Sequence, residues 1–194
     1  MRIQPKGKAV YQLKVTLSGV KPPIWRRFLV PSGITLAQLH GVLQVVMGWT
    51  NSHLHKFIAK GVIYELPDAE SYGAHEDERR SVLEEILTKP KDRLTYKYDF
   101  GDNWEHEVVL EAVAPFEVGA RYPCVVAGKR ACPPEDVGGV WGYADLLATL
   151  GEPDDPEREE MLEWVGESFN PEAFNANELN VALHGGWLPP ESKL

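Results

Sequence analysis

Strict alternation of apolar and polar side chains constrains this chain most, because a two-residue repeat is the pattern of strands and not of helices. The longest such pattern covers residues 94–111. Its apolar or aromatic positions are Leu94, Tyr96, Tyr98 and Phe100, followed by Trp104, His106, Val108 and Leu110. A three-residue connection, 101–103, would pair Phe100 with Trp104 and keep one apolar face, whereas a two-residue connection would set Phe100 against Glu105. Register follows the hydrophobic pattern, so we predict a hairpin with the three-residue connection.

Two further segments predict paired strands. Residues 8–18 alternate, and after a turn that contains Gly and Pro a second strand follows at 24–30, so these two form an antiparallel hairpin. Residues 54–65 predict a strand or a hairpin. The three segments together predict one antiparallel sheet.

One helix is well marked between the first two of these segments. Thr35 and Gln38 have the spacing of a capping box, and an apolar stripe runs from there to Met47. Gly48 is placed to end the helix. The predicted fold class is therefore α+β, an antiparallel sheet of hairpins with one face covered by the helix at 35–47.

The remaining segments predict loops and shorter helices. Residues 67–80 are polar and predict a surface loop, and Ser81-x-x-Glu84 predicts a second capping box and a short helix. Residues 119–139 are rich in Gly and Pro and predict a long ordered loop. A C-terminal helical segment follows, with helices expected at 141–150, 156–165 and 175–184 that pack around the first helix. We expect one domain over 1–194, with a core in 1–115 and a loop-rich, helical part in 116–194.

Composition and cysteine content place limits on the class of protein. Hydrophobic residues make up 43% and charged residues 25%, which is typical of a globular domain with a real core. The chain has no apolar run of membrane-spanning length and no secretory leader, so we expect a cytoplasmic protein without a membrane partner. Cys124 and Cys132 lack the spacing of a zinc knuckle and are interpreted as buried free thiols; a loop clip or a metal site shared with a histidine are the alternatives.

Charge is distributed unevenly along the chain. Residues 1–100 contain 15 basic and 10 acidic groups, whereas residues 101–194 contain 5 basic and 19 acidic groups. One interpretation is that the two halves attract each other. The other is that the basic part faces a polyanion, with Arg26 and Arg27 beside Trp25 gripping a phosphate or stacking on a base. Nucleic acid is the partner that this second interpretation implies.

A second group of residues could hold a divalent metal. In a strand, His53 and His55 would share a face, and imidazole pairs suit metal ions. Candidates for a third ligand are His106, Asp99 and Asp102, which come from the polar segment 98–106. The same three residues could serve as an acid or a base. The alternative for this segment is a tight hairpin turn built from Gly, Asp and Asn.

A third group lies in the loop that ends at Gly139. Glu135 and Asp136 stand between two prolines and two glycines, and they are candidates for hydrogen-bond acceptors at a ligand-binding edge. Trp104 and Trp141 could line a groove for a peptide or a protein partner. The alternative is a loop that only packs against the hairpin.

Several stretches together resemble the plasmid pRiA4b ORF-3-like family. They are Tyr11 to Arg27 with its Lys-Pro-Pro-Ile-Trp-Arg-Arg end, the Leu36 to Phe57 run, Tyr98-Asp-Phe-Gly-Asp-Asn-Trp-Glu-His106, and Arg130-Ala-Cys-Pro-Pro-Glu-Asp-Val-Gly-Gly139 with Trp141-Gly-Tyr143. The resemblance implies an α+β fold and a link with plasmids and mobile elements, but it supplies no catalytic residues. Some members carry a transposon-resolvase label, which Ser18 and Ser32, both at turns, do not support. Members often have a cysteine where this chain has Val137.

Three functions stay open at this point. The first is a nucleic-acid-associated or accessory binding module that uses the basic first part of the chain. The second is a metal-dependent hydrolase built from His53, His55, His106, Asp99 and Asp102. The third is a peptide or protein interaction module. Salt-sensitive nucleic-acid binding, bound metal and a metal-free apolar cleft are the observations that would separate them.

Overall fold

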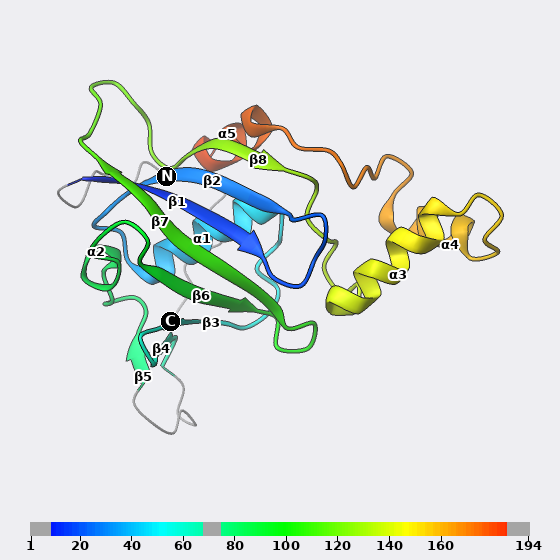
Figure 1. The fold of residues 1–194 in the computed structure, drawn as a ribbon, viewed down its shortest axis with the longest axis horizontal. Coiled ribbons are helices and arrows are strands. Elements are labelled where there is room, and N and C mark those ends of the chain that lie inside the picture. Colours follow the sequence, from blue (N-terminus) through cyan, green and yellow to red (C-terminus); the bar gives the residue numbers. More distant parts are fainter. Residues whose placement is uncertain (1–8, 68–74, 186–194) are drawn as a thin grey trace.

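A computed structural model describes residues 9–67 and 75–185 of the chain. In that part of the chain the order of elements is β1 (Val10–Leu17), β2 (Trp25–Pro31), α1 (Leu36–Met47), β3 (His55–Ala59), β4 (Val62–Glu65), β5 (His75–Asp77), α2 (Leu83–Ile86), β6 (Arg93–Tyr98), β7 (Trp104–Ala114), β8 (Cys124–Lys129), α3 (Gly139–Gly151), α4 (Arg158–Val165) and α5 (Ala176–His184). The strands form one eight-stranded sheet in the order β5-β4-β3-β6-β7-β1-β2-β8 (Figure 1). All neighbouring pairs are antiparallel except β4 and β5. The fold class is therefore α+β, as predicted.

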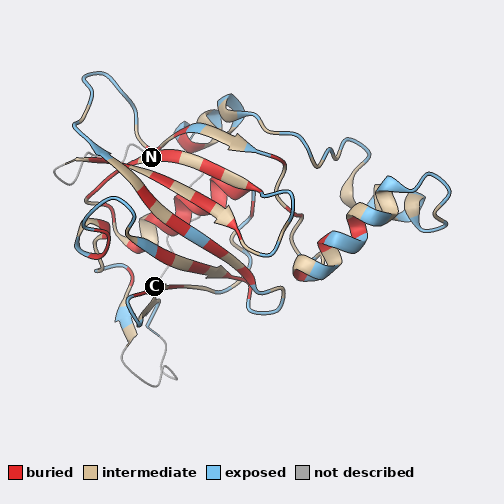
Figure 2. Cartoon of the chain, in the orientation of Figure 1, coloured by how far each residue is buried: buried red, intermediate tan, exposed pale blue. Residues whose placement is uncertain are grey.

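Helix α1 lies across one face of the sheet and carries most of the core between them (Figure 2). It begins as predicted, because the Thr35 hydroxyl accepts a hydrogen bond from the Gln38 amide while the Gln38 side chain accepts one from the Thr35 amide. It ends at Gly48, whose φ of 79° is the left-handed conformation that glycine adopts without strain. No helix in the described ranges is long and apolar enough to cross a membrane.

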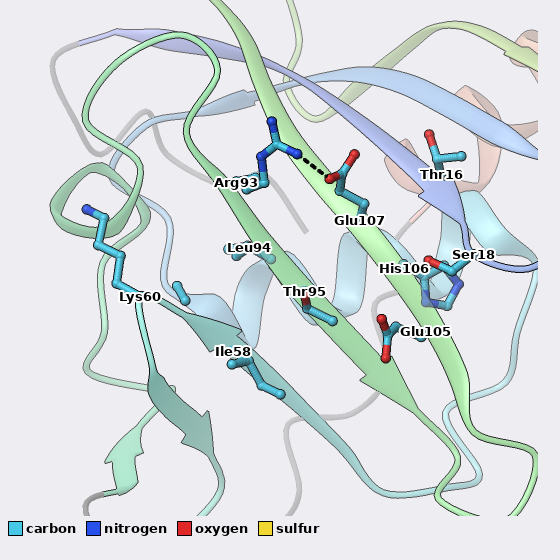
Figure 3. A pocket seen from close by; sticks show the side chains of 11 residues that line it. Thr16, Ser18, Ile58, Lys60, Arg93, Leu94, Thr95, Glu105, His106 and Glu107 are labelled. Atoms are coloured by element: carbon cyan, nitrogen blue, oxygen red, sulfur yellow. Dashed lines mark hydrogen bonds and ion pairs between the residues drawn. The ribbon is translucent and has the colours of Figure 1, made fainter.

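The opposite face of the sheet carries polar and charged side chains. Three cross-strand ion pairs lie on it: Arg27–Glu111, Arg93–Glu107 and Lys97–Glu105. This face explains why one helical layer suffices, since an antiparallel sheet can leave one side to water. A pocket of about 520 Å³ lies on this side, and the Arg93–Glu107 pair is among the residues that line it (Figure 3).

The predicted connection of the hairpin at 94–111 is wrong. Tyr98 pairs with Trp104, so the connection has five residues, 99–103, and Phe100 lies in it with 49% of its surface exposed. The observed register differs from the predicted one by two residues, and a shift of two leaves every side chain on the same face. Asp99 and Asn103 close the turn with φ of 54° each and a hydrogen bond from the Asn103 amide to the Asp99 carbonyl.

Three further predictions are wrong in part. Strand β8 occupies the middle of the segment predicted as a loop at 119–139, and β5 lies within the polar segment 67–80, of which residues 68–74 lie outside the described residues. The Ser81 hydroxyl donates to the Asp77 carbonyl instead of capping α2, which begins after Val82 without a side-chain cap. Both missed strands are at sheet edges, where few side chains are buried and alternation is weak.

The C-terminal helices form as predicted, but they do not all pack around α1. Helix α5 lies against β8 and α1. Helices α3 and α4 extend away from the sheet (Figure 1). Tyr143 and Leu146 are the core contacts of α3, and α4 buries no residue.

Candidate metal centre

Three side chains from separate segments converge beside the turn between β6 and β7. The His53 Nε2 lies 3.2 Å from an Asp136 carboxylate oxygen and 3.7 Å from an Asp99 carboxylate oxygen, and one ligand atom of each residue lies within 4.8 Å of the others. Ligands of one ion at bond lengths of about 2.0–2.2 Å lie roughly 3–4 Å apart. Among residues 9–67 and 75–185, no other three His, Cys, Asp or Glu side chains meet this condition.

Backbone contacts hold the segments of two of these candidate ligands, His53 and Asp99. His53 lies between α1 and β3, where the Asn51 amide donates to the Gln44 side chain and the Ser52 amide donates to the Tyr98 hydroxyl. Asp99 begins the β6–β7 turn, and its amide donates to the Leu54 carbonyl at 2.9 Å. One Asp99 carboxylate oxygen accepts from the Gly101 amide at 2.9 Å, which leaves the other oxygen facing His53.

The third ligand comes from the loop before α3. The Asp136 backbone has a φ of 60°, and the Asp99 backbone is also left-handed, so two of the three ligands adopt a conformation that few non-glycine residues take. The loop is fastened at both ends. The buried Trp49 indole donates to the Pro133 carbonyl, and the Gly138 amide donates to an Asp102 carboxylate oxygen.

Glycine is required where this loop meets the β6–β7 turn. Gly139 has a φ of 68°, and a Cβ atom at this position would lie 2.5 Å from the Asp102 carbonyl oxygen. The close approach brings the two loops together and so brings Asp136 to His53. Asp102 therefore supports the centre through loop docking instead of facing His53.

The electrostatics of this region favour a cation. Two facing loops carry four carboxylates, those of Asp99 and Asp102 in the β6–β7 turn and those of Glu135 and Asp136 in the loop before α3. Within the described part of the chain, none of these carboxylates has a Lys or Arg nitrogen within 4.0 Å. The His53 Nε2 is buried and makes no hydrogen bond, although two carboxylates face it. Buried polar atoms in proteins usually have a hydrogen-bond or metal partner, so this nitrogen is a candidate metal ligand.

Exposure is graded across the three ligands. The side chains of Asp99, His53 and Asp136 are 10%, 28% and 72% exposed. An ion held here would be covered on the Asp99 side and open to solvent on the Asp136 side. Open positions beside three protein ligands are the arrangement of catalytic metal sites and not of structural ones.

The structure separates His55 from His53. The His55 Nε2 lies 2.9 Å from a carboxylate oxygen of the buried Glu78, and its ring stacks on the His40 ring at 3.5 Å. His40 also contacts the hydroxyl of Tyr96 at 2.8 Å, and burial lowers the pKa of His40 to about 3. Because β3 begins only at His55, the two-residue repeat does not extend to His53, and the two imidazoles face different surroundings.

His106 and Trp104 lie under the candidate centre and not on its surface. Both side chains are fully buried, and each ring contacts Trp49, with centroid distances of 5.2 Å for His106 and 5.9 Å for Trp104. Burial lowers the pKa of His106 to about 4. A molecule arriving from solvent would contact neither side chain. His106 and Trp104 therefore stabilise the core beneath the loops.

The two arginines are engaged in structural contacts. The buried Arg26 guanidinium donates to the carbonyls of Val46 and Lys129 and to the Cys132 thiol. Arg27 pairs with Glu111 at 2.5 Å, and the hydrogen bond raises the pKa of Arg27 and lowers that of Glu111. The basic segment is thus partly neutralised by the acidic half of the chain.

The cysteines and Trp141 stand apart from the three ligands. Cys124 and Cys132 are free thiols, so there is no loop clip between them, and burial raises the pKa of Cys132 to about 11. Trp141 lies in the first turn of α3 and is 84% exposed.

The sequence identified His53 and Asp99 as candidate ligands but did not place Asp136 with them. It also missed the role of Glu135, which binds to the segments that carry His53 and Asp99. The available signal was the pair of acids between Pro-Pro and Gly-Gly, a pattern typical of a loop that is held in a defined shape.

Comparisons with known proteins agree with this fold. The chain is 43% identical over 177 residues to the uncharacterized protein y4hQ of Sinorhizobium fredii (strain NBRC 101917 / NGR234). The aligned residues cover 90% of this chain and 91% of the relative. It is similar to the crystal structure of a protein of unknown function, MM3350, from Methanosarcina mazei Go1, with a TM-score of 0.83 and 36% identity over 89% of this chain and 98% of that chain. The model of the plasmid pRiA4b ORF-3-like protein family matches residues 9–178. The chain therefore belongs to the plasmid pRiA4b ORF-3-like family.

Proposed function

We propose that this protein binds a divalent transition-metal ion through His53, Asp99 and Asp136 and uses it in a hydrolytic reaction. The observation that carries the proposal is the buried His53 Nε2, which faces two carboxylates but makes no hydrogen bond. An ion at this point would give the nitrogen its partner and would neutralise the two acids.

The donor set indicates the class of metal. One imidazole nitrogen with two carboxylate oxygens suits Zn²⁺, Mn²⁺ or Fe²⁺, whereas Ca²⁺ and Mg²⁺ favour oxygen ligands alone. The Asp99 carboxylate is aimed by the Gly101 amide, so one of its oxygens is committed to the protein and the other is free for the ion.

The open side of the centre supports chemistry on a molecule that arrives from solvent. When bound, such an ion would polarise a substrate oxygen or lower the pKa of a water molecule toward neutrality. The chain's own part is to cover the Asp99 side and to leave the exposed Asp136 side accessible. A substrate would therefore approach over Asp136, past the loop that carries Glu135.

A polyanion-binding module has less support from the structure. Arg26 is buried and its guanidinium donates to the main-chain carbonyls of Val46 and Lys129, and Arg27 is held by Glu111. The loops around His53 present four carboxylates. Binding of a phosphate-rich partner at these loops would require the ion to be present first.

The test is metal binding by the purified, untagged protein. We expect near-stoichiometric uptake of Zn²⁺ or Mn²⁺ after dialysis, and at least about 100-fold weaker binding in His53→Gln, Asp99→Asn and Asp136→Asn. His75→Gln is the matched control, because it removes a histidine that faces Glu65 elsewhere in the fold. Absence of uptake by the wild type, or an equal loss in His75→Gln, would refute the proposal.

The hydrolytic part needs its own measurement. The metal-loaded protein should be screened with chromogenic carboxylic esters, phosphate esters and peptides. Turnover should require the added metal and disappear in Asp136→Asn. Metal binding without turnover on any of these classes would leave a binding function and contradict the hydrolytic one.

A further inference from the structure

Asp136 is the exposed candidate ligand, and no residue in the ranges 9–67 and 75–185 holds its carboxylate by a hydrogen bond. Its side chain is 72% exposed and its backbone is left-handed, so its position is not fixed by burial or by a favoured conformation. The distance of 3.2 Å between its carboxylate and the His53 Nε2 therefore depends on how the loop around Asp136 is held. The residue next to it, Glu135, makes the contacts that fix the loop.

Glu135 binds both segments that carry the other two ligands. One of its carboxylate oxygens accepts from the Thr50 amide at 3.0 Å and from the Thr50 hydroxyl at 2.5 Å, and Thr50 lies on the segment of His53. The other oxygen accepts from the Tyr98 hydroxyl at 2.5 Å, and Tyr98 immediately precedes Asp99. One carboxylate thus connects the three segments that meet at the centre.

The partners of Glu135 are themselves held firmly. The Tyr98 hydroxyl accepts a hydrogen bond from the Ser52 amide at 3.0 Å, and its ring stacks on the buried Trp49. The Tyr98 hydroxyl accepts from one segment and donates to Glu135, so its direction is fixed on both sides.

We propose that Glu135 is a positioning residue that assembles the metal centre by holding Asp136 over His53. This inference rests on the metal site proposed above and adds the residue on which its third ligand depends. Glu135 does not contact the ion in this account. Its effect on affinity passes through Asp136 alone.

Two explanations of a Glu135 effect must be separated. Removal of one negative charge near a cation would weaken binding whether or not Asp136 is present. Loss of positioning would weaken binding only while Asp136 can still act as a ligand. A double-mutant cycle distinguishes these cases, because residues that act through one another show non-additive effects.

The experiment measures Co²⁺ affinity and the visible Co²⁺ spectrum of the full chain. The variants are Glu135→Ala, Asp136→Asn and the double variant. We expect Glu135→Ala to weaken binding about 10- to 100-fold, with the spectral change seen in Asp136→Asn. In the Asp136→Asn background the further loss should stay below about threefold. Glu105→Ala is the matched control, because it removes a carboxylate of the same hairpin that pairs with Lys97.

Three outcomes would overturn the inference. They are binding by Glu135→Ala within about threefold of the wild type, an equal loss of affinity with and without Asp136, and an equal loss in Glu105→Ala. If Glu135→Ala does not fold, Tyr98→Phe and Thr50→Ala each remove a donor while keeping the carboxylate, and each should weaken Co²⁺ binding severalfold; unchanged affinity in both would likewise refute it. Failure of the wild type to bind Co²⁺ would instead refute the metal site itself.

Discussion

Acid should destabilise this protein through two histidines that the fold keeps neutral. His40, a buried residue of α1, stacks on His55, and His106 lies between Trp49 and Tyr96. Burial lowers the pKa of His40 to about 3 and that of His106 to about 4, from about 6.5 in an unfolded chain. The perturbation is a change from pH 7 to pH 5.

The direction follows from the number of bound protons. Between pH 6.5 and the folded pKa values, the unfolded chain takes up a proton at each histidine that the folded protein does not, so the free energy of unfolding falls as pH falls. At pH 5 the solution is about 1.5 pH units below the unfolded-state pKa of each histidine. At about 1.36 kcal/mol per unit, each histidine then lowers the free energy of unfolding by about 2 kcal/mol. We expect a loss of about 4 kcal/mol for the pair, with full stability above pH 6.5.

The assay is urea unfolding followed by tryptophan fluorescence at pH 7, 6 and 5 with a chelator present. His40→Gln and His106→Phe should each reduce the loss between pH 7 and pH 5 by about half, whatever their stability at pH 7. The urea m-value should stay constant, which shows that the same surface is exposed on unfolding. A wild-type loss below about 1 kcal/mol, or an unchanged loss in both variants, would refute the assignment of neutral buried histidines.

Three further predictions follow from contacts described above. Gly139→Ala places a Cβ atom against the Asp102 carbonyl and should lower the free energy of unfolding by about 2 kcal/mol or more in urea melts. Arg26→Met should cost about 2–4 kcal/mol because buried carbonyls lose their donor, whereas Arg27→Ala, which breaks a partly exposed ion pair, should cost about 1 kcal/mol or less. Saturating Zn²⁺ at 100 times its Kd should add about 2.7 kcal/mol of stability, seen as a higher Tm in calorimetry, and Asp136→Asn should abolish the gain.

The sequence predicted the elements whose signal is local. The alternation at 8–18 and 94–111 indicated which side chains face α1, and Thr35, Gln38 and Gly48 marked both ends of that helix. Alternation cannot distinguish registers that differ by two residues, so the position of Phe100 had to come from the structure.

The sequence did not predict the elements that depend on contacts with distant segments. Strand β8 buries only Val125 among its side chains, and α5 covers its outer edge through Asn180, which bonds the amide and the carbonyl of Val125. Nothing in the residues 124–129 alone reveals that pairing. The same limit explains why the polar segment before Ser81 concealed the buried Glu78.

The residues of the candidate site also divide into those with a local sequence signal and those placed by tertiary contacts. His53 and Asp99 were found because imidazole and carboxylate side chains beside turns are suited to bind metals. Asp136 joins them only because Glu135 and Gly139 dock a distant loop, a contact that no local pattern encodes. The His55 imidazole instead contacts the carboxylate of Glu78, which follows the edge strand β5.

The most direct test of the metal centre is anomalous diffraction from crystals soaked in Zn²⁺. We predict one peak at about 2.0–2.2 Å from the His53 Nε2 and from one carboxylate oxygen each of Asp99 and Asp136. A peak held instead by His55 and Glu78, or no peak with the His53 ring unmoved, would contradict the account.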